Sequence, residues 1–148
     1  MARIKDAREA AMVGRRSDGT LTRRPLSPHL QVYDMMQMTS LLSILHRISG
    51  VAWCGGLVLL VWWLSAAATS DAYFDMVQRF FGHWFGRMLL FGFTWALVHH
   101  ALGGLRHLLW DTGRGFDLPL VEWMARATII GSVAVTILLW IIGYGVMP

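Results

Sequence analysis

The stretch His99-His100-Ala101-Leu102-Gly103-Gly104-Leu105-Arg106-His107 lies near the end of a long apolar run that extends from about Trp84 to Trp110. A run of this length is sufficient to cross a bilayer as a helix. Ionisable residues are costly inside a membrane, and those that occur there usually mark a functional site. Three histidines and one arginine within nine residues therefore predict a membrane helix that holds a ligand or cofactor.

Two of these histidines share a helix face. His100 and His107 are seven residues apart, which places them on one side of a helix and roughly 10 Å apart along its axis. A deep imidazole and a shallower polar group suit a haem, with His100 on the iron and His107 near the propionates. Two alternatives stay open at this point. His99, which points about 100° away, could be the ligand instead, or the histidine could hydrogen-bond a neighbouring helix.

Composition indicates an integral membrane protein. Of the 148 residues, 55% are hydrophobic and 15% are charged, and eight are tryptophan. A soluble helical domain would carry charges along one face of every helix, whereas here they concentrate outside three apolar runs. We therefore predict an all-α protein with three transmembrane helices at about residues 41–66, 84–110 and 125–147. These helices form one membrane-anchor domain over residues 25–148, preceded by a basic polar arm over residues 1–24.

The segments beside the spans carry helix-start and turn signals. Ser40 is the predicted N-cap of the first span. The polar connection over residues 67–83 is expected to include a short interfacial helix. Gly113, Gly115 and Pro119 predict a break between the second span and the third.

The basic residues predict the orientation of the chain in the membrane. By the positive-inside rule, the side richer in lysine and arginine faces the cytoplasm. With the N-terminus inside, 11 of the 13 basic residues lie on the inner side, and Arg79 and Arg87 lie outside. We therefore expect the N-terminus inside and the C-terminus outside. The basic arm indicates contact with anionic lipid and not with nucleic acid, because no aromatic interleaving or nucleic-acid motif accompanies it.

This topology brings two polar clusters to one depth. His46 and Arg47 begin the first span, and Arg106 and His107 end the second, so both pairs lie near the inner surface. They form a predicted cationic cluster for haem propionates, with snorkelling to lipid headgroups as the alternative. Ser43 lies one turn before Arg47, and this pair is a candidate for hydrogen bonds to a quinone carbonyl. Helix capping and backbone bonding are the alternative for the serine.

A six-coordinate haem needs a second axial ligand. The other histidines lie outside the membrane or at its edge, away from the depth of His100: His29, His46, His83 and His107. The second histidine must then come from another polypeptide, so the chain is predicted to be one half of a shared haem-binding helix bundle. Gly103 and Gly104 each cost roughly 1 kcal/mol inside a helix, which indicates close approach of a macrocycle or of a second helix.

Three motifs resemble those of a known family. They are Arg24-Pro25-Leu26-Ser27-Pro28-His29-Leu30-Gln31-Val32-Tyr33, Ser43-Ile44-Leu45-His46-Arg47-Ile48-Ser49-Gly50 and His100-x-x-x-Gly104-Leu105-Arg106-His107-x-x-x-Asp111. Together, and with three spans in the right order, they resemble the cytochrome b membrane-anchor subunits of succinate dehydrogenase, respiratory complex II. The resemblance covers about residues 23–148. The first 22 residues have no counterpart that we can assign.

The resemblance implies a subunit of succinate:ubiquinone oxidoreductase. In that family a flavoprotein subunit oxidises succinate and an iron–sulfur subunit passes the electrons on. Two small membrane anchors share one haem b and help to form the ubiquinone site. Carried over by motif, His100 would be the axial ligand of the haem iron, opposite a histidine of the second anchor. Ser43 and Arg47 would line the quinone pocket, and His46, Arg47 and His107 would lie near the propionates.

The resemblance also implies a cellular location. The Pro-x-x-Pro segment before the first span is similar to that of bacterial and mitochondrial-type members, and the acidic residues in the arm argue against a transit peptide. We therefore expect a multi-pass protein of the bacterial inner membrane, with the mitochondrial inner membrane as the alternative.

Other functions remain as alternatives to this interpretation. One is a haem-free structural anchor, and another is a fumarate- or menaquinone-type homologue. An independent transmembrane cytochrome would need paired histidines at similar depth on two spans of one chain. A transporter would need a carboxylate in the middle of a span, and the sequence has none there.

Overall fold

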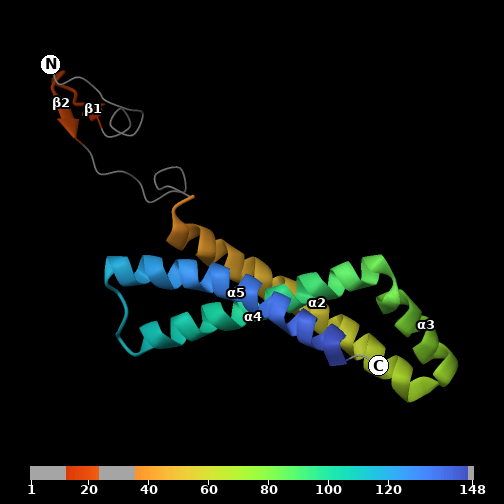
Figure 1. Cartoon of the computed structure of the whole chain (residues 1–148). Helices are drawn as coiled ribbons and strands as arrows, with labels where there is room; N and C mark the ends of the chain where they lie inside the picture. Colours follow the sequence, from red (N-terminus) through yellow and green to blue (C-terminus); the bar gives the residue numbers. More distant parts are fainter. Residues whose placement is uncertain (1–12, 24–35, 147–148) are drawn as a thin grey trace. The chain divides into compact units, whose positions relative to one another are not determined.

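A computed structural model describes residues 13–23 and 36–146 of the chain. They contain a hairpin of β1 (Val13–Arg15) and β2 (Leu21–Arg23), and the helices α2 (Met38–Thr69), α3 (Asp71–Gly82), α4 (Trp84–Asp111) and α5 (Leu118–Val146) (Figure 1). The hairpin and the helices belong to separate units, and each is considered on its own. Residues 1–12 of the predicted arm and the Pro-x-x-Pro segment at 24–33 lie outside the described residues.

Residues 13–23 form an antiparallel hairpin that the sequence analysis did not predict. Asp18 stabilises its turn, because the carboxylate accepts hydrogen bonds from the hydroxyl and the backbone N–H of Thr20 at 2.6 and 2.9 Å. These hydrogen bonds hold the pKa of the Asp18 carboxyl below its ordinary value. Gly19 follows with a φ of 84°, a conformation that favours glycine.

Three helices, α2, α4 and α5, are long and apolar enough to cross a membrane, in agreement with the three predicted spans. Two of them begin earlier than predicted. Ser40 lies inside the first turn of α2, because the helix already starts at Met38. Pro119 lies in the first turn of α5 and does not break it. The N–H groups of a first turn have no intrahelical partner, so proline is tolerated there.

α3 is the short helix expected between the first two spans. Ser70 caps it by accepting a hydrogen bond from the backbone N–H of Tyr73 at 3.3 Å. Two tryptophans of α2 hold the helix in place. Trp62 Nε1 donates to the Tyr73 hydroxyl at 2.8 Å, and Trp63 Nε1 donates to Gln78 Oε1 at 3.1 Å. α3 therefore packs beside the end of α2 and the start of α4 (Figure 1).

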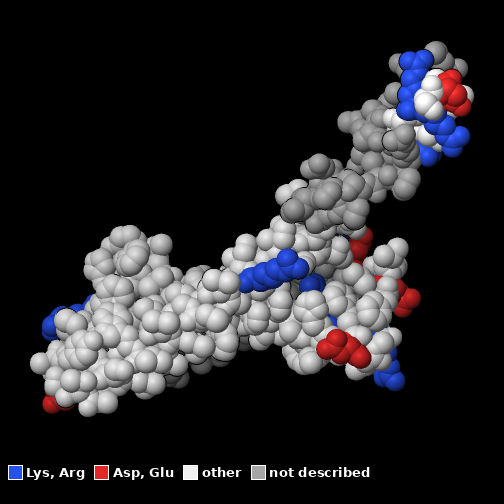
Figure 2. All heavy atoms as spheres, turned by 180° about the vertical axis from the view of Figure 1, so that it is seen from behind, with Lys and Arg blue, Asp and Glu red and all other residues white. Residues whose placement is uncertain are grey.

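Small and polar residues form the seams between the spanning helices. α4 packs against both α2 and α5, and the buried positions include Ala66, Ala96, Ala125 and Ser132. Such residues let helix backbones approach closely in a membrane. In the most apolar stretch of each spanning helix, only 6 to 17% of the residues are buried inside the protein. The broad uncharged area in Figure 2 belongs to this outer surface, which requires lipid or partner chains to cover it.

Candidate functional site

Three histidines from two helices meet at one end of the helical unit. The His46 ring of α2 stacks on the His100 ring of α4, with centroids 4.1 Å apart and planes 3° apart. The His46 ring also lies 5.1 Å from the His107 ring. We call His46, His100 and His107 the histidine cluster. Its contacts place the start of α2 and the end of α4 at one level, where the sequence topology places them.

The surroundings of His100 determine which ring nitrogen carries its proton. Nδ1 lies 3.1 Å from the backbone carbonyl oxygen of His46 and 3.4 Å from Ser49 Oγ. A carbonyl oxygen only accepts hydrogen bonds, so the proton resides on Nδ1 and Nε2 keeps its lone pair. Metal-ligating histidines are commonly oriented in this way. Gly50 permits the approach, because a Cβ at that position would lie 3.0 Å from His100 Cε1.

His99 faces a different helix from His100. It is 1% exposed, and its Nδ1 lies 3.3 Å from Ser132 Oγ of α5. Its ring stacks on Trp95 with centroids 5.1 Å apart. His99 therefore contacts a neighbouring helix, the arrangement that the sequence analysis gave as the alternative for His100. His100 makes such a contact too, with the His46 carbonyl oxygen of α2. His100 is the member of the pair that belongs to the histidine cluster.

Two buried nitrogens in this region have no hydrogen-bond partner. They are His46 Nδ1 and Arg106 Nε, the only such buried side-chain atoms in the described part of the chain. Arg106 is 7% exposed, and its guanidinium carbon lies 5.0 Å from the centre of the Trp110 ring. It shares the buried face of α4 with His99, whereas His107 is exposed. A buried guanidinium N–H without an acceptor is costly, so the Nε of Arg106 calls for an acceptor that the described residues do not supply.

Ser43 and Arg47 lie one turn apart on α2, and both are exposed. Neither side chain makes a hydrogen bond or ion pair with another described residue. The alternative role for the Ser43 hydroxyl, a hydrogen bond to the helix backbone, is therefore not seen in the structure. Both side chains are available to a ligand beside the histidine cluster, since His46 lies between them in the chain.

Comparison with known proteins identifies the family. Residues 20–142 match the model of the succinate dehydrogenase/fumarate reductase transmembrane subunit. The chain belongs to this family. It is 43% identical over 119 residues to the succinate dehydrogenase cytochrome b556 subunit of Paracoccus denitrificans, covering 80% of this chain and 91% of that protein. The subunit of the same name from Rickettsia conorii is 37% identical over 119 residues, covering 80% of this chain and 92% of that protein. The mitochondrial succinate dehydrogenase cytochrome b560 subunit of Mus musculus is 35% identical over 115 residues, covering 75% of this chain and 66% of that protein.

Membership of the succinate dehydrogenase cytochrome b family confirms the resemblance found in the sequence. The chain is a membrane-anchor subunit of the complex II type, integral to an inner membrane. Haem and electron transport follow from the family. The histidine cluster, Ser43 and Arg47 all lie on helices within the matched residues 20–142.

The sequence analysis missed the α2 residues that surround His100. The Trp53 ring lies 6.5 Å from the His100 ring and is within 7° of parallel to it. Trp53 comes seven residues after His46, the same spacing that relates His100 to His107. Helical periodicity therefore places Trp53 on the same face of α2 as His46. The Ser49 hydroxyl donates to the His46 carbonyl oxygen at 2.9 Å. A backbone contact of this kind leaves no pattern in the sequence.

Gly103 and Gly104 provide a matched test of the helix contact at the cluster. A Cβ at Gly103 would lie 2.5 Å from His46 Nδ1, whereas nothing lies within 4 Å of one at Gly104. We expect Gly103→Ala to destabilise the subunit by about 1–3 kcal/mol, because the ring or the helix must shift. Gly104→Ala should be neutral or stabilising by up to about 1 kcal/mol. Thermal unfolding of the purified complex measures both effects, and equal shifts would contradict the contact.

Proposed function

We propose that this chain is the cytochrome b anchor of succinate:ubiquinone oxidoreductase, sharing one haem b with a second small anchor subunit and helping to form the ubiquinone reduction site. The observation that carries the haem assignment is the buried Nε of Arg106, which has no hydrogen-bond partner among the described residues. Arg106 is one of the residues that the sequence analysis assigned to the propionates. A carboxylate would supply the acceptor that this Nε lacks.

His100 fits the role of axial ligand to the haem iron. The His46 carbonyl oxygen, 3.1 Å from Nδ1, orients the ring and leaves Nε2 for the metal. A haem b bound there supplies one-electron redox chemistry. His46 does not fit the second axial position, because its ring lies face to face with that of His100 at 4.1 Å. The second histidine that would hold the iron is therefore assigned to the partner anchor.

Four residues are assigned to the propionates: His46, Arg47, Arg106 and His107. His46 and His107 are in contact, and Arg47 follows His46 on the exposed side of α2. Hydrogen bonds from such groups to a carboxylate contribute about 1.5–3 kcal/mol each. Arg106 is buried, which does not fit the alternative of snorkelling to lipid headgroups.

Ser43 and Arg47 are assigned to ubiquinone. A hydroxyl and a guanidinium one turn apart can both donate to a quinone carbonyl oxygen, on which negative charge accumulates as electrons arrive. The iron–sulfur subunit delivers these electrons, and the flavoprotein subunit oxidises succinate. This chain is assigned no part in the succinate chemistry, so its activity exists only within the complex.

The proposed orientation has the N-terminus inside and the C-terminus outside. It is supported by the distribution of basic residues, and it puts the histidine cluster near the inner face. We assign the chain to a bacterial inner membrane, which the 43% identity to the Paracoccus denitrificans protein supports over the 35% identity to the mouse mitochondrial one. A fumarate- and menaquinone-linked homologue is the second candidate, because the family description covers both enzymes.

Substitution of Arg106 tests the haem assignment. We expect the Arg106→Leu complex to lose haem to excess apomyoglobin about 10-fold faster than the unsubstituted complex, because a charge-assisted hydrogen bond to a propionate is lost. The b-type α-band in the dithionite-reduced minus oxidised spectrum measures the haem that is retained.

Arg126→Leu is the control for this experiment. Arg126 pairs with Glu122 at 3.4 Å on the exposed surface, where such pairs contribute little. Equal haem retention in Arg106→Leu and Arg126→Leu would contradict the assignment of Arg106 to the propionates. If the unsubstituted complex reduces a soluble dye with succinate yet has no b-type band, the haem assignment is wrong and the haem-free anchor takes its place.

A further inference from the structure

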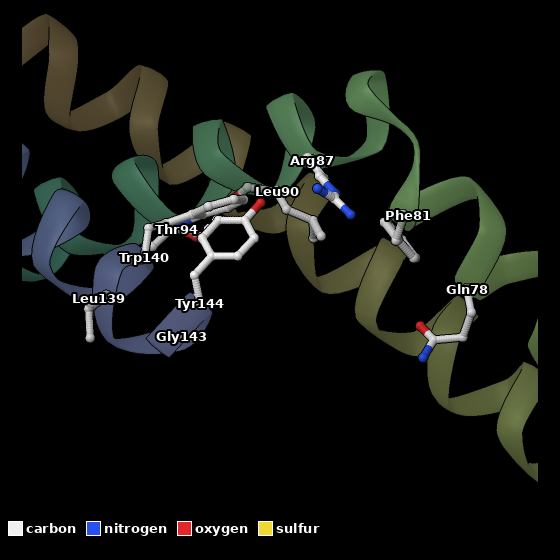
Figure 3. Close-up of a pocket in the computed structure, with 10 residues that line it drawn as sticks. Gln78, Phe81, Arg87, Leu90, Thr94, Leu139, Trp140, Gly143 and Tyr144 are labelled. Atoms are coloured by element: carbon white, nitrogen blue, oxygen red, sulfur yellow. Dashed lines mark hydrogen bonds between the residues drawn. The ribbon is translucent and has the colours of Figure 1, made fainter. Parts of the chain in front are cut away.

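A groove opens between α3, α4 and α5 at the end of the helical unit away from the histidine cluster (Figure 3). Its volume is about 580 Å³, within the range of small-molecule sites. Figure 3 places Thr94 and Trp140 toward one end and Gln78 toward the other, with Arg87 between them. Arg87 precedes His100 by 13 residues, or roughly 20 Å along α4. The groove is therefore separate from the proposed haem and quinone residues.

The free hydrogen-bond donors of the groove belong to Arg87 of α4, Tyr144 of α5 and Gln78 of α3. Arg87 has no carboxylate within 4 Å among the described residues, and its guanidinium carbon lies 6.0 Å from the centre of the Tyr144 ring. The Tyr144 hydroxyl makes no hydrogen bond within the part of the chain that the structure describes. Gln78 accepts from Trp63 through Oε1, which leaves its NH₂ group able to donate. This end of the groove therefore suits an anion.

The end of the groove at Thr94 and Trp140 offers no free donor. Trp140 Nε1 donates to Thr94 Oγ1 at 3.2 Å, and the Thr94 hydroxyl donates to the Leu90 carbonyl oxygen at 2.8 Å. The neighbouring lining is the side chains of Leu90 and Leu139 and the ring of Trp140. Nothing lies within 4 Å of a Cβ built at Gly143, so the space there is open. A ligand that suits both ends has an anionic head and a hydrocarbon body.

We propose that this groove binds a membrane glycerophospholipid, with its phosphate at Arg87 and one acyl chain against Leu90, Leu139 and Trp140. The phosphate supplies the anion that Arg87 lacks. Arg87 also lies in the first turn of α4, where the helix dipole favours negative charge. Trp84, which is 64% exposed at the start of α4, is typical of residues at the headgroup level of a membrane.

Two other occupants fit the groove less well. A ubiquinone ring at the Thr94 and Trp140 end of the groove needs donors for its carbonyl oxygens, and Trp140 Nε1 and the Thr94 hydroxyl already donate to other acceptors. A transmembrane helix of a partner is about 10–12 Å wide with its side chains, and it would surround Arg87 with apolar side chains unless it brought its own carboxylate. A phospholipid satisfies both ends of the groove with one molecule.

Photo-crosslinking in the intact complex tests this proposal. The complex is placed in phosphatidylcholine nanodiscs that contain a small fraction of phosphatidylglycerol with a diazirine on its acyl chain, and the labelled peptides are identified by mass spectrometry. We expect labelling of the segments that contain Leu90 and Leu139. Labelling should fall about 10-fold in Arg87→Leu, which removes the phosphate contact. Gly143→Leu should lower the labelling as well, because the new side chain fills the groove. This variant retains Arg87.

Arg126→Leu, on α5 far from the groove, is the matched control and should label as the unsubstituted complex does. Equal labelling of Arg87→Leu and the unsubstituted complex would overturn the phosphate contact. Unchanged labelling of Gly143→Leu would overturn the groove as the site. Displacement of the label by added ubiquinone, but not by unlabelled phosphatidylglycerol, would assign the groove to a quinone. Absence of label from both segments would mean that another chain covers the groove, which also overturns the proposal.

Discussion

Replacing His100 with alanine is expected to remove haem from the complex. His100 is the one residue of this chain assigned to the iron, and its Nδ1 is already oriented by the His46 carbonyl oxygen at 3.1 Å. Loss of an outer-shell partner of a metal ligand costs roughly 10- to 100-fold in metal affinity, so loss of the ligand itself should cost more. The b-type α-band of the reduced minus oxidised spectrum should therefore be absent from the purified His100→Ala complex.

His99→Ala is the matched control for that variant. His99 is its neighbour in the sequence, but it is 1% exposed and contacts Ser132 across the seam between α4 and α5. The Ser132 hydroxyl keeps its hydrogen bond to the Ile129 carbonyl oxygen at 2.9 Å. We expect His99→Ala to lose about 1–3 kcal/mol of stability and to retain the b-type band.

Three results would count against this assignment of the two histidines. Succinate oxidation with a soluble dye reports assembly of both variants. Native-like spectra for both assembled variants would refute His100 as the ligand. Loss of the band in His99→Ala alone would transfer the role to His99. Loss of the band in both would mean that the packing of α4 against α5, and not one imidazole, determines haem binding.

The meeting of the start of the first span with the end of the second was predictable because it depends on chain direction and helix rise. Bilayer thickness sets the length of a span, so three apolar runs give three helices of known direction. The first span begins at the surface where the second one ends. The contact between the His46 and His107 rings at 5.1 Å follows from that arrangement, although the two residues are far apart in the sequence.

The rotation of α4 about its axis was not predictable from the sequence. The helix is apolar almost all round, so no hydrophobic face determines which side meets α2 and which meets α5. Side-chain contacts decide it, since His99 contacts Ser132 and His100 contacts the His46 carbonyl oxygen. The same rotation buries Arg106, which the sequence analysis grouped with the exposed His107.

The hairpin at residues 13–23 was missed for a different reason. Its strands have only three residues each, too few for an alternating pattern to stand out. The charges of the arm dominated the interpretation. The Asp18-Gly19 pair is nevertheless a known hairpin signal. In the structure it ends a three-residue loop, in which the Gly19 N–H donates to the Arg16 carbonyl oxygen at 3.0 Å and Gly19 has a positive φ.

Replacing Arg47 with leucine is expected to lower ubiquinone reduction by the complex about 100-fold, the effect of removing one donor to a developing oxyanion. Arg47 is exposed and has no ion pair among the described residues, so its loss should cost little stability. Ser43→Ala should lower the rate about 2- to 10-fold, because a neutral hydrogen bond contributes less. Both variants should oxidise succinate normally with a soluble dye, which takes electrons before the quinone site.

Arg47 is assigned to both the propionates and the quinone. Measurements of haem retention and of the quinone reduction rate distinguish the two roles. A propionate role predicts that haem retention falls together with the quinone rate in Arg47→Leu. A quinone role predicts that the rate falls while the b-type band is retained, and that Ser43→Ala shows the same split. Arg47→Lys keeps the charge but loses the planar fork, so it should restore haem retention more fully than quinone reduction. Loss of dye-linked oxidation in Arg47→Leu would instead mean failed assembly, and native quinone rates in both variants would remove Ser43 and Arg47 from the site.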